Sequence, residues 1–184
     1  GPQDRPQGGK VSITIPAPRG IEAAGRSSVV WVPALANPAA PTLAEIAAGV
    51  HLSCPIGGFE PSVDQSTRSS RLYCEKQAVE TPGTPSYSLA PMRLLDDPQR
   101  TDTGAQYDYL ETIVEGAQGF LINRRGLDYD AAYAAAQRVT VYPTKVGAVL
   151  EVPLDLSDDG GQKFEVEYRL FVTGKVRHGA IMGA

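Results

Sequence analysis

The chain has 184 residues, a mass of 19.5 kDa and a formal net charge of −4, which allow one domain with a sizeable core and an extended arm. The acidic balance argues against nucleic-acid binding, because carboxylates repel a phosphate backbone. No segment approaches the ~20 apolar residues of a membrane span and no signal-peptide pattern is present, so we expect no membrane contact and folding in a cytoplasm.

Residues that form turns are abundant along the whole chain. The 19 Gly and 15 Pro separate short apolar runs instead of gathering in one tract. Many short strands joined by turns give this distribution, whereas helices exclude most Gly and Pro. The composition therefore favours a mainly β architecture.

The first 26 residues differ from the rest. After a polar start, Val11, Ile13 and Ile15 alternate with polar residues. So short a pattern builds no core, but it is able to add a strand to another surface. We therefore expect an extended arm at 1–26, ordered by a neighbouring molecule, and a β domain at 27–184.

The next stretch predicts a strand, a helix and another strand. Residues 29–32 are an apolar run that contains Trp31 and ends at Pro33, as buried strands do. Thr42 and Glu45 have the spacing of a capping box and predict a helix of about two turns. A strand is expected at 50–54.

The segment 55–70 is polar and rich in Gly and Ser, which predicts a long exposed loop with a strand near 60–65. Strands are expected at 71–75 and 86–95, with a turn at 81–85 between them.

The hydrophobic period changes after Gly104. Tyr107, Leu110, Ile113 and Val114 follow spacings of three and four, which predict a helix of about 12 residues. A strand is expected at 119–123.

The last third predicts the longest strands. The Ala-rich segment 130–137 fits a helix or a loop, and 138–152 is β-rich with bends or bulges at Pro143 and Gly147. Residues 164–176 alternate between apolar and polar side chains, the clearest strand signal in the chain. About eight strands and one flanking helix predict a β-sandwich or barrel.

Sequence patterns for catalysis or metal binding are weak. His51 and His178 have no further ligands at zinc-site spacing, and the acidic pairs at 96–97 and 158–159 are flanked by Pro or Gly, which favours turns over calcium sites. The chain has neither a phosphate-binding loop nor a nucleophile elbow. We therefore expect no enzyme activity, no metal and no cofactor.

Four further polar residues leave alternatives open. Cys54 and Cys74 are expected as reduced, half-buried thiols, since two cysteines make no disulfide framework. Arg124 and Arg125 fit a solvated strand end or an intersubunit salt bridge better than a phosphate site.

Several segments resemble one protein family. They are the run Trp-Val-Pro-Ala-Leu-Ala-Asn at 31–37, the segment 40–49, Arg-Gly-Leu-Asp-Tyr at 125–129 with its Ala-rich continuation and then 139–143, and Tyr-Arg-Leu-Phe-Val-Thr-Gly at 168–174 followed by Val176. In this order they resemble the major tail tube proteins of long-tailed bacteriophages that infect actinobacteria. The resemblance covers about 28–176.

The resemblance implies a structural virion protein with a tail-tube-like β-sandwich or barrel. Such subunits assemble as hexameric rings that stack into the phage tail tube, the conduit for genome ejection. Implied partners are further copies of the chain, the tape measure protein and other tail proteins, and duplex DNA passes through the lumen without specific binding. Assembly is expected in the cytoplasm of the host bacterium.

These expectations single out candidate contact residues. Subunit-interface candidates are Val11, Ile13 and Ile15 of the arm, Gly57 and Gly58 of the polar segment 57–70, and the basic pair Arg124 and Arg125. Glu165 and Glu167, on the polar face of the last predicted strand, are candidates for the lumen, although a solvated face or pairing across subunits fits their pattern equally well.

Three other classes compete with the tail tube. A capsid decoration protein or a tail terminator shares the virion role but forms no long polymer. A carbohydrate-binding module needs a row of exposed aromatic side chains, whereas Trp31 lies in a buried-type run and the tyrosines are scattered. The hypothesis of an enzyme is supported by none of the sequence motifs.

Overall fold

The computed structural model describes residues 14–101, 106–158 and 160–184. Within them the chain forms nine strands and two short helices. In chain order these are β1 (Ser27–Val32), α1 (Leu43–Ala47), β2 (Val50–His51), β3 (Pro61–Ser70), β4 (Val79–Leu89), β5 (Met92–Leu95), α2 (Asp108–Thr112), β6 (Gln118–Arg125), β7 (Arg138–Glu151), β8 (Glu165–Val172) and β9 (Arg177–Ile181).

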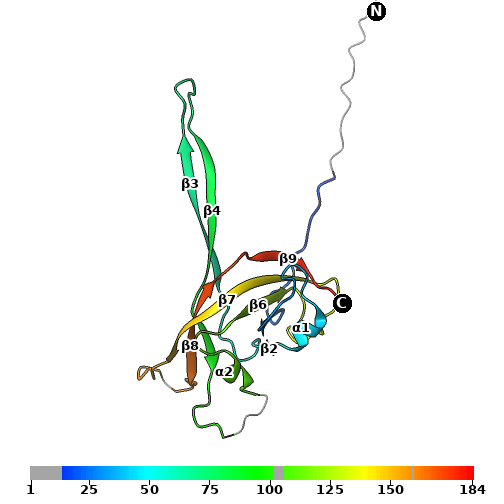
Figure 1. Ribbon diagram of the computed structural model, residues 1–184, viewed down its shortest axis with the longest axis vertical. Coiled ribbons are helices and arrows are strands. Elements are labelled where there is room, and N and C mark those ends of the chain that lie inside the picture. The colour runs from blue at the N-terminus through cyan, green and yellow to red at the C-terminus, as the bar shows by residue number, and fades with distance from the viewer. Residues whose placement is uncertain (1–13, 102–105, 159) are drawn as a thin grey trace, which may run out of the picture.

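Seven strands form one antiparallel sheet, which we call the body sheet. Its order is β2-β1-β6-β7-β8-β5, and β9 pairs with the first part of β7 while β8 pairs with the later part. The sheet curls into a half-barrel, with α1 and α2 on its flanks (Figure 1). The predicted mainly β class is confirmed.

Both faces of the body sheet carry buried side chains. Val29 and Trp31 of β1 belong to one apolar cluster, and Val30 and Val32 belong to the other. Successive strand residues point to opposite faces, so an unbroken apolar run is what a strand covered on both sides requires. The predicted strand at 29–32 is confirmed for this reason.

The long strand β7 bends at Gly147. Its pairing with β8 shifts register between Val146 and Val149, and a Cβ at Gly147 would lie 2.5 Å from the ring of Phe171. Any larger residue at this position would push the exposed Phe171 ring aside, so glycine suits the bulge where the two strands come together. The bulge predicted at this residue is confirmed.

The strands β3 and β4 form a separate two-stranded hairpin that projects from the body (Figure 1). The sequence predictions were wrong here. The segment 71–75 lies in the connecting turn instead of a strand, and 81–85 lies inside β4 instead of a turn. A polar, Pro-containing ribbon has no buried face and therefore lacks the apolar alternation that marks a strand.

The helix predictions succeeded at α1 and failed in length at α2. The Thr42 hydroxyl accepts a hydrogen bond from the Glu45 backbone N–H at 3.3 Å, as the capping spacing predicted. In contrast, α2 has five residues instead of about 12, because the chain is extended again at Ile113. Ile113, one of the residues with helical spacing, is buried but follows the end of the helix with extended backbone.

The last third of the chain agrees with the prediction in one place and differs in another. Residues 130–137 form a loop, one of the two predicted alternatives. The strand expected at 164–176 is β8, which ends earlier, at Val172, and β9 begins at Arg177, beyond the expected range, where it pairs with β7. The strand β9 was not predicted.

Candidate assembly surfaces

The hairpin presents two unpaired strand edges. Within the described chain, β3 and β4 pair only with each other, and their side chains are exposed nearly throughout. Bonds across the ribbon include Ser62 to Ser88 between hydroxyls at 2.7 Å and the Gln65 amide donating to the Gly83 carbonyl at 2.8 Å. An isolated two-stranded ribbon is marginally stable in water. The hairpin is therefore the first candidate for a contact with another molecule.

One edge of this ribbon is protected against strand addition. Pro82 and Pro85 lie within β4, opposite Thr67 and Gln65. Proline has no backbone N–H to donate to a further strand and occurs on sheet edges that are not extended. We therefore expect the hairpin to contact other molecules through its side chains and not by pairing a further strand along β4.

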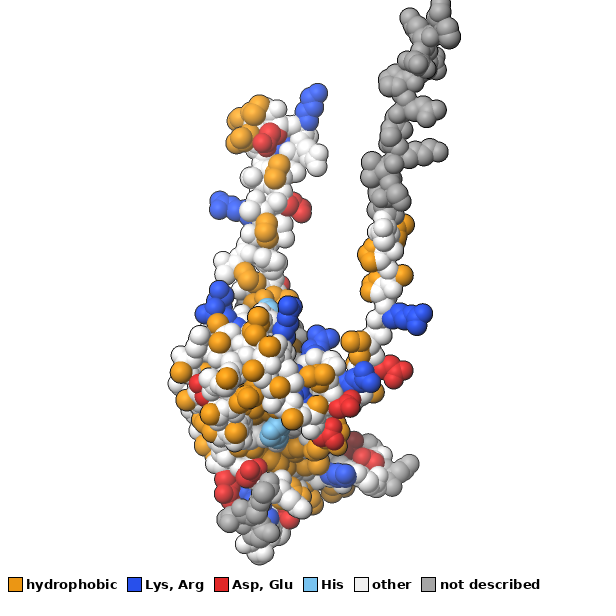
Figure 2. Space-filling model, turned by 90° about the vertical axis from the view of Figure 1, so that its right-hand side faces the viewer, with side chains coloured by type: hydrophobic (Ala, Val, Ile, Leu, Met, Phe, Trp, Pro, Cys, Tyr) orange, Lys and Arg blue, Asp and Glu red, His pale blue; other side chains and the backbone are white. Residues whose placement is uncertain are grey.

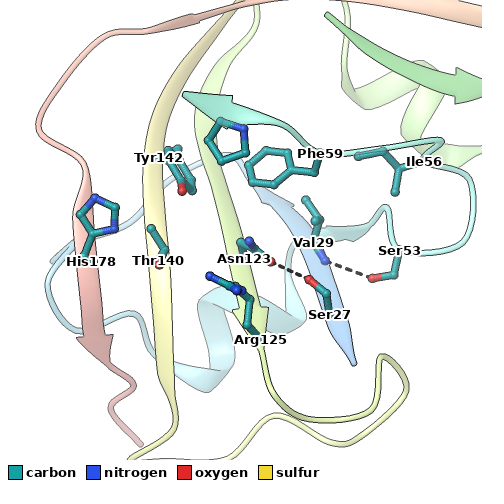
Figure 3. Close-up of a pocket in the computed structure, with 11 residues that line it drawn as sticks. Ser27, Val29, Ser53, Ile56, Phe59, Asn123, Arg125, Thr140, Tyr142 and His178 are labelled. Atoms are coloured by element: carbon teal, nitrogen blue, oxygen red, sulfur yellow. Dashed lines mark hydrogen bonds between the residues drawn. The ribbon is translucent and has the colours of Figure 1, made fainter. Parts of the chain in front are cut away.

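A polar hollow of about 480 Å³ lies on the body sheet. Figure 3 shows its lining: Ser27 and Val29 from β1, Asn123 and Arg125 from β6, Thr140 and Tyr142 from β7, His178 from β9, and Ser53, Ile56 and Phe59 from the segment between β2 and β3. The Ser27 hydroxyl donates to the Asn123 amide oxygen at 3.0 Å, and the Val29 backbone N–H donates to the Ser53 hydroxyl at 3.1 Å.

The lining of this hollow does not form a catalytic constellation. It contains no Asp or Glu, so His178 has no carboxylate there to orient it. His178 instead lies 3.3 Å from the Tyr87 hydroxyl. Across the described ranges there is also no group of three or more His, Cys, Asp or Glu residues able to hold a metal ion.

The two basic candidates have different environments. Arg125 is exposed at the edge of the polar hollow and remains a candidate contact residue. Arg124 is completely buried, so its prediction as a solvated or interface side chain was wrong. Every second residue of a strand lies on the same face, and residue 124 of β6 therefore lies on the face of the buried Ile122.

The buried Arg124 organises the loop after β6. Its guanidinium donates to the backbone carbonyls of Ala131 at 2.7 Å and Asp128 at 3.0 Å, and to the Gln137 side-chain oxygen at 3.2 Å. It also lies over the Tyr133 ring, 4.0 Å from the ring centre. Sequence reasoning missed this role, although an arginine in phase with apolar strand residues was a signal for it.

The arm is tied to this loop at its base. The Gly126 N–H donates to the Arg26 carbonyl at 2.9 Å, and the Tyr129 N–H donates to the Gly25 carbonyl at 2.8 Å. Ile15 is exposed, whereas Val11 and Ile13 lie outside the described residues. The structure thus leaves Ile15 available for a partner.

The predicted glycines lie at the base of the hairpin and not on it. The Gly57 N–H donates to the Arg93 carbonyl at 3.1 Å, and the Leu95 N–H donates to the Pro55 carbonyl at 3.1 Å. The segment 55–57 therefore covers the outer edge of β5. Gly57 and Gly58 are both exposed.

Glu165 and Glu167 lie on the face of β8 opposite the buried Val166 and Tyr168. Arg93 of the neighbouring β5 donates to Glu167 at 3.1 Å. The two carboxylates are partly exposed, and one of them is compensated by a cation. This face is polar, nearly balanced in charge and open to solvent.

The cysteines are free and exposed, so the expectation of half-buried thiols was wrong. Cys54 follows β2 in the body, and Cys74 lies in the turn at the tip of the hairpin. In the described part of the chain, none of the helices is long and apolar enough to span a membrane.

The curled antiparallel sheet, the projecting hairpin and the absence of a catalytic or metal constellation in the described residues define a mainly β protein whose exposed features are suited to protein contacts. Comparison with known families makes this specific: the profile of a family described as "Phage tail tube protein" matches residues 16–184. The chain belongs to the phage tail tube protein family. The resemblance to this family is confirmed, and the actinobacterial host stays a prediction.

Two other comparisons add less. No curated protein matches the chain. Among solved structures, a chain from "Cryo-EM structure of the anti-feeding prophage (AFP) baseplate, 6-fold symmetrised" is similar over 90% of this chain and 96% of its own, with 9% identity and a TM-score of 0.44.

Proposed function

We propose that this protein assembles as stacked hexameric rings that form the tube of a phage tail, the conduit for genome ejection. Its membership of the tail tube protein family makes it a structural component of the virion tail. The observation that carries the proposal further is the hairpin, since 21 strand residues leave the body with almost no burial of their own. Such a ribbon gains stability when a second copy covers it.

Electron microscopy of the purified protein tests the proposal directly. Negative-stain images should show hollow cylinders of uniform width, and end-on views should classify as six-fold rings. Monomers or closed trimers at every concentration would instead favour a decoration-type role. Rings that never stack would favour a tail terminator.

The partly exposed face of β8 is proposed to line the channel. Glu165 and Glu167 repel phosphate, and the Arg93 pair with Glu167 keeps that arginine from binding it. Transit of duplex DNA without specific binding fits such a surface. A helical reconstruction that places both carboxylates away from the lumen would contradict this assignment.

The arm at 1–26 is proposed to link neighbouring subunits, including Val11, Ile13 and the exposed Ile15. Removal of residues 1–20 retains Gly25 and Arg26, which bind the loop after β6. The shortened chain should therefore fold and polymerise poorly. Tubes of normal length from this chain would refute the role of the arm. The tape measure protein and other tail proteins are proposed as further partners, and we propose no catalytic activity.

A further inference from the structure

Resting on the proposed function, we infer that the polar hollow of one copy binds an acidic, leucine-flanked segment of a second copy. This segment, residues 154–156, lies in the turn that follows β7 and is here called the Leu-Asp-Leu segment. The ligand of the hollow is therefore a carboxylate with an apolar side chain on either side of it. The inference gives the predicted interface residue Arg125 a specific partner.

The polar groups of the hollow offer more hydrogen-bond donors than acceptors. The Ser27 hydroxyl donates to the amide oxygen of Asn123 at 3.0 Å, which leaves the amide nitrogen of Asn123 to donate to a ligand. The Ser53 hydroxyl accepts from the Val29 N–H at 3.1 Å and keeps its own proton for another partner. Among the described residues, no carboxylate forms an ion pair with Arg125. A ligand that supplies acceptor oxygens would satisfy these groups.

The charge of the hollow favours an anion. Arg125 contributes a positive charge to the lining, which contains no Asp or Glu. Burial raises the pKa of the Tyr142 hydroxyl, although the nearby Arg125 opposes the rise, so this hydroxyl stays protonated at neutral pH and adds another donor. Charge-assisted hydrogen bonds between a guanidinium and a carboxylate are stronger than neutral ones. A carboxylate is therefore the group that suits this set of side chains.

The remaining lining is apolar and suits the two leucines. Ile56, Phe59 and Pro61 line the hollow together with the polar residues, and Figure 3 shows Phe59 and Ile56 on the side opposite Arg125 and Ser27. The volume of about 480 Å³ is that of a site for a ligand larger than a lone carboxylate. A cationic side and an apolar side in one hollow favour a segment that combines both kinds of group.

The Leu-Asp-Leu segment presents these groups on an ordered turn. Leu154 is 64% exposed and Leu156 is 89% exposed, so neither contributes to the core. The Asp155 N–H donates to the Gln162 side-chain oxygen at 2.8 Å, and the Ser157 N–H and hydroxyl donate to one carboxylate oxygen of Asp155 at 2.9 and 2.6 Å. The bonds from Ser157 lower the pKa of Asp155, which keeps it ionised. Because the turn is preformed, little conformational entropy is lost on docking.

The two surfaces lie at opposite ends of β7 and therefore meet only between different copies. Tyr142 lines the hollow, and the turn begins after Glu151, the last residue of the strand. At ~3.3 Å per residue, the strand from Tyr142 to Glu151 spans about 30 Å, and the turn projects from the body on the side away from α1 (Figure 1). Figure 2 shows Lys and Arg side chains around the base of the hairpin and acidic side chains grouped near the end of the body that faces away from it. A contact between two different surfaces repeats from copy to copy in an assembly.

A charge exchange tests the ion pair. Arg125→Glu and Asp155→Arg should each raise the critical concentration for polymerisation at least about tenfold, because each brings like charges together in the contact. The double variant restores a pair with reversed signs and should polymerise within about threefold of the parent. As a matched control, Arg125→Glu with Glu111→Arg has the same net charge but places the new arginine on α2, so it should stay as impaired as Arg125→Glu alone. Sedimentation and negative-stain microscopy measure polymer, and circular dichroism should show every variant folded, since Arg125 and Asp155 are exposed.

Crosslinking detects the contact without changing a charge. Cys54→Ser and Cys74→Ser remove the natural thiols, Thr140→Cys places a thiol in the lining of the hollow, and Pro153→Cys places one beside the Leu-Asp-Leu segment. Oxidation of the assembled protein with diamide should give a covalent ladder of dimers, trimers and longer chains, because each copy carries both thiols. Formation of the bond requires Cα atoms within about 7 Å. Either new cysteine alone should give no ladder.

The outcomes separate this inference from the proposed function. Restored polymerisation in the double charge exchange, together with the covalent ladder, would support the docking. Tubes from Arg125→Glu at the concentration of the parent would overturn the docking and leave the proposed function intact, and so would tubes of the two-cysteine protein that give no ladder. Absence of ordered polymers from the unsubstituted chain at every concentration would overturn both.

Discussion

The body sheet and the hairpin are both antiparallel, but different interactions stabilise them. Strands of the body bury side chains on both faces, as Trp31 and Val30 of β1 show. The hairpin strands are of similar length and bury almost none. Burial of apolar area supplies most of the free energy of folding, so the body is expected to be stable alone. The hairpin is maintained by its backbone ladder and, in the proposed assembly, by a neighbour.

The largest expected effect separates assembly from folding. Replacing residues 65–85 with Asn-Gly joins the paired residues Asp64 and Ser86 by a two-residue turn that suits an antiparallel hairpin. This variant should lose tube formation completely while its melting temperature stays within a few degrees of the parent. Microscopy and circular dichroism measure the two outcomes. A shortened chain that unfolds would show that the hairpin stabilises the body and would break the comparison.

The next effect concerns the core of the body. Trp31 is 1% exposed, and Trp31→Ala should lower the free energy of unfolding by about 3–5 kcal/mol through lost burial and a cavity. The matched hairpin variant, Val63→Ala, should change it by less than about 0.5 kcal/mol, because Val63 is exposed. Denaturant unfolding followed by circular dichroism measures both. Similar losses of stability from the two variants would contradict the distinction between a buried body and an exposed hairpin.

Replacing the buried Arg124 should lower the free energy of unfolding by less than replacing Trp31. Arg124→Met keeps the chain length but removes the donors to Asp128, Ala131 and Gln137, which should cost about 3 kcal/mol in the free energy of unfolding. Arg125→Met, at the exposed neighbour, should cost less than about 0.5 kcal/mol. Equal effects at the two positions would argue against the distinction drawn between them.

The body should also lose stability at high pH. Burial raises the pKa of Tyr109 and of Tyr168 to about 12, and the Tyr109 hydroxyl donates to the Leu95 carbonyl at 2.7 Å. The unfolded chain releases these protons near pH 10, so it binds fewer protons than the folded chain between pH 10 and 12. The free energy of unfolding should therefore fall as pH rises through that window.

Tyrosine variants test whether the buried tyrosines cause this loss of stability at high pH. Tyr168→Phe should weaken the pH dependence of the denaturation midpoint, measured at several pH values above 9. Tyr73→Phe, which changes the exposed tip, should leave it unaltered. A slope unchanged by Tyr168→Phe would show that other groups cause the loss.

The smallest expected effect lies within the hairpin. Ser88→Ala removes the exposed hydroxyl contact with Ser62 and should change the free energy of unfolding by less than about 0.5 kcal/mol. Urea denaturation of parent and variant measures it. A loss above 1 kcal/mol would show that the ribbon contributes directly to the stability of the body.

The sequence predicted elements where side-chain patterning and local chemistry act together. The apolar run around Trp31 and the cap at Thr42 belong to this group. The sequence did not predict the hairpin, because its polar strands are defined by cross-strand bonds alone. The sequence also did not predict the burial of Arg124, because this charged side chain is buried only where the loop after β6 supplies carbonyl acceptors.

The position of the hairpin at one pole of the subunit has a consequence for any filament built from it. A head-to-tail polymer of such subunits has a direction, with free hairpins at one end and the opposite sides of the bodies at the other. Proteins that cap the two ends of such a polymer must then bind two chemically different surfaces. In the proposed tube, the two ends are therefore distinguished by the structure of a single subunit.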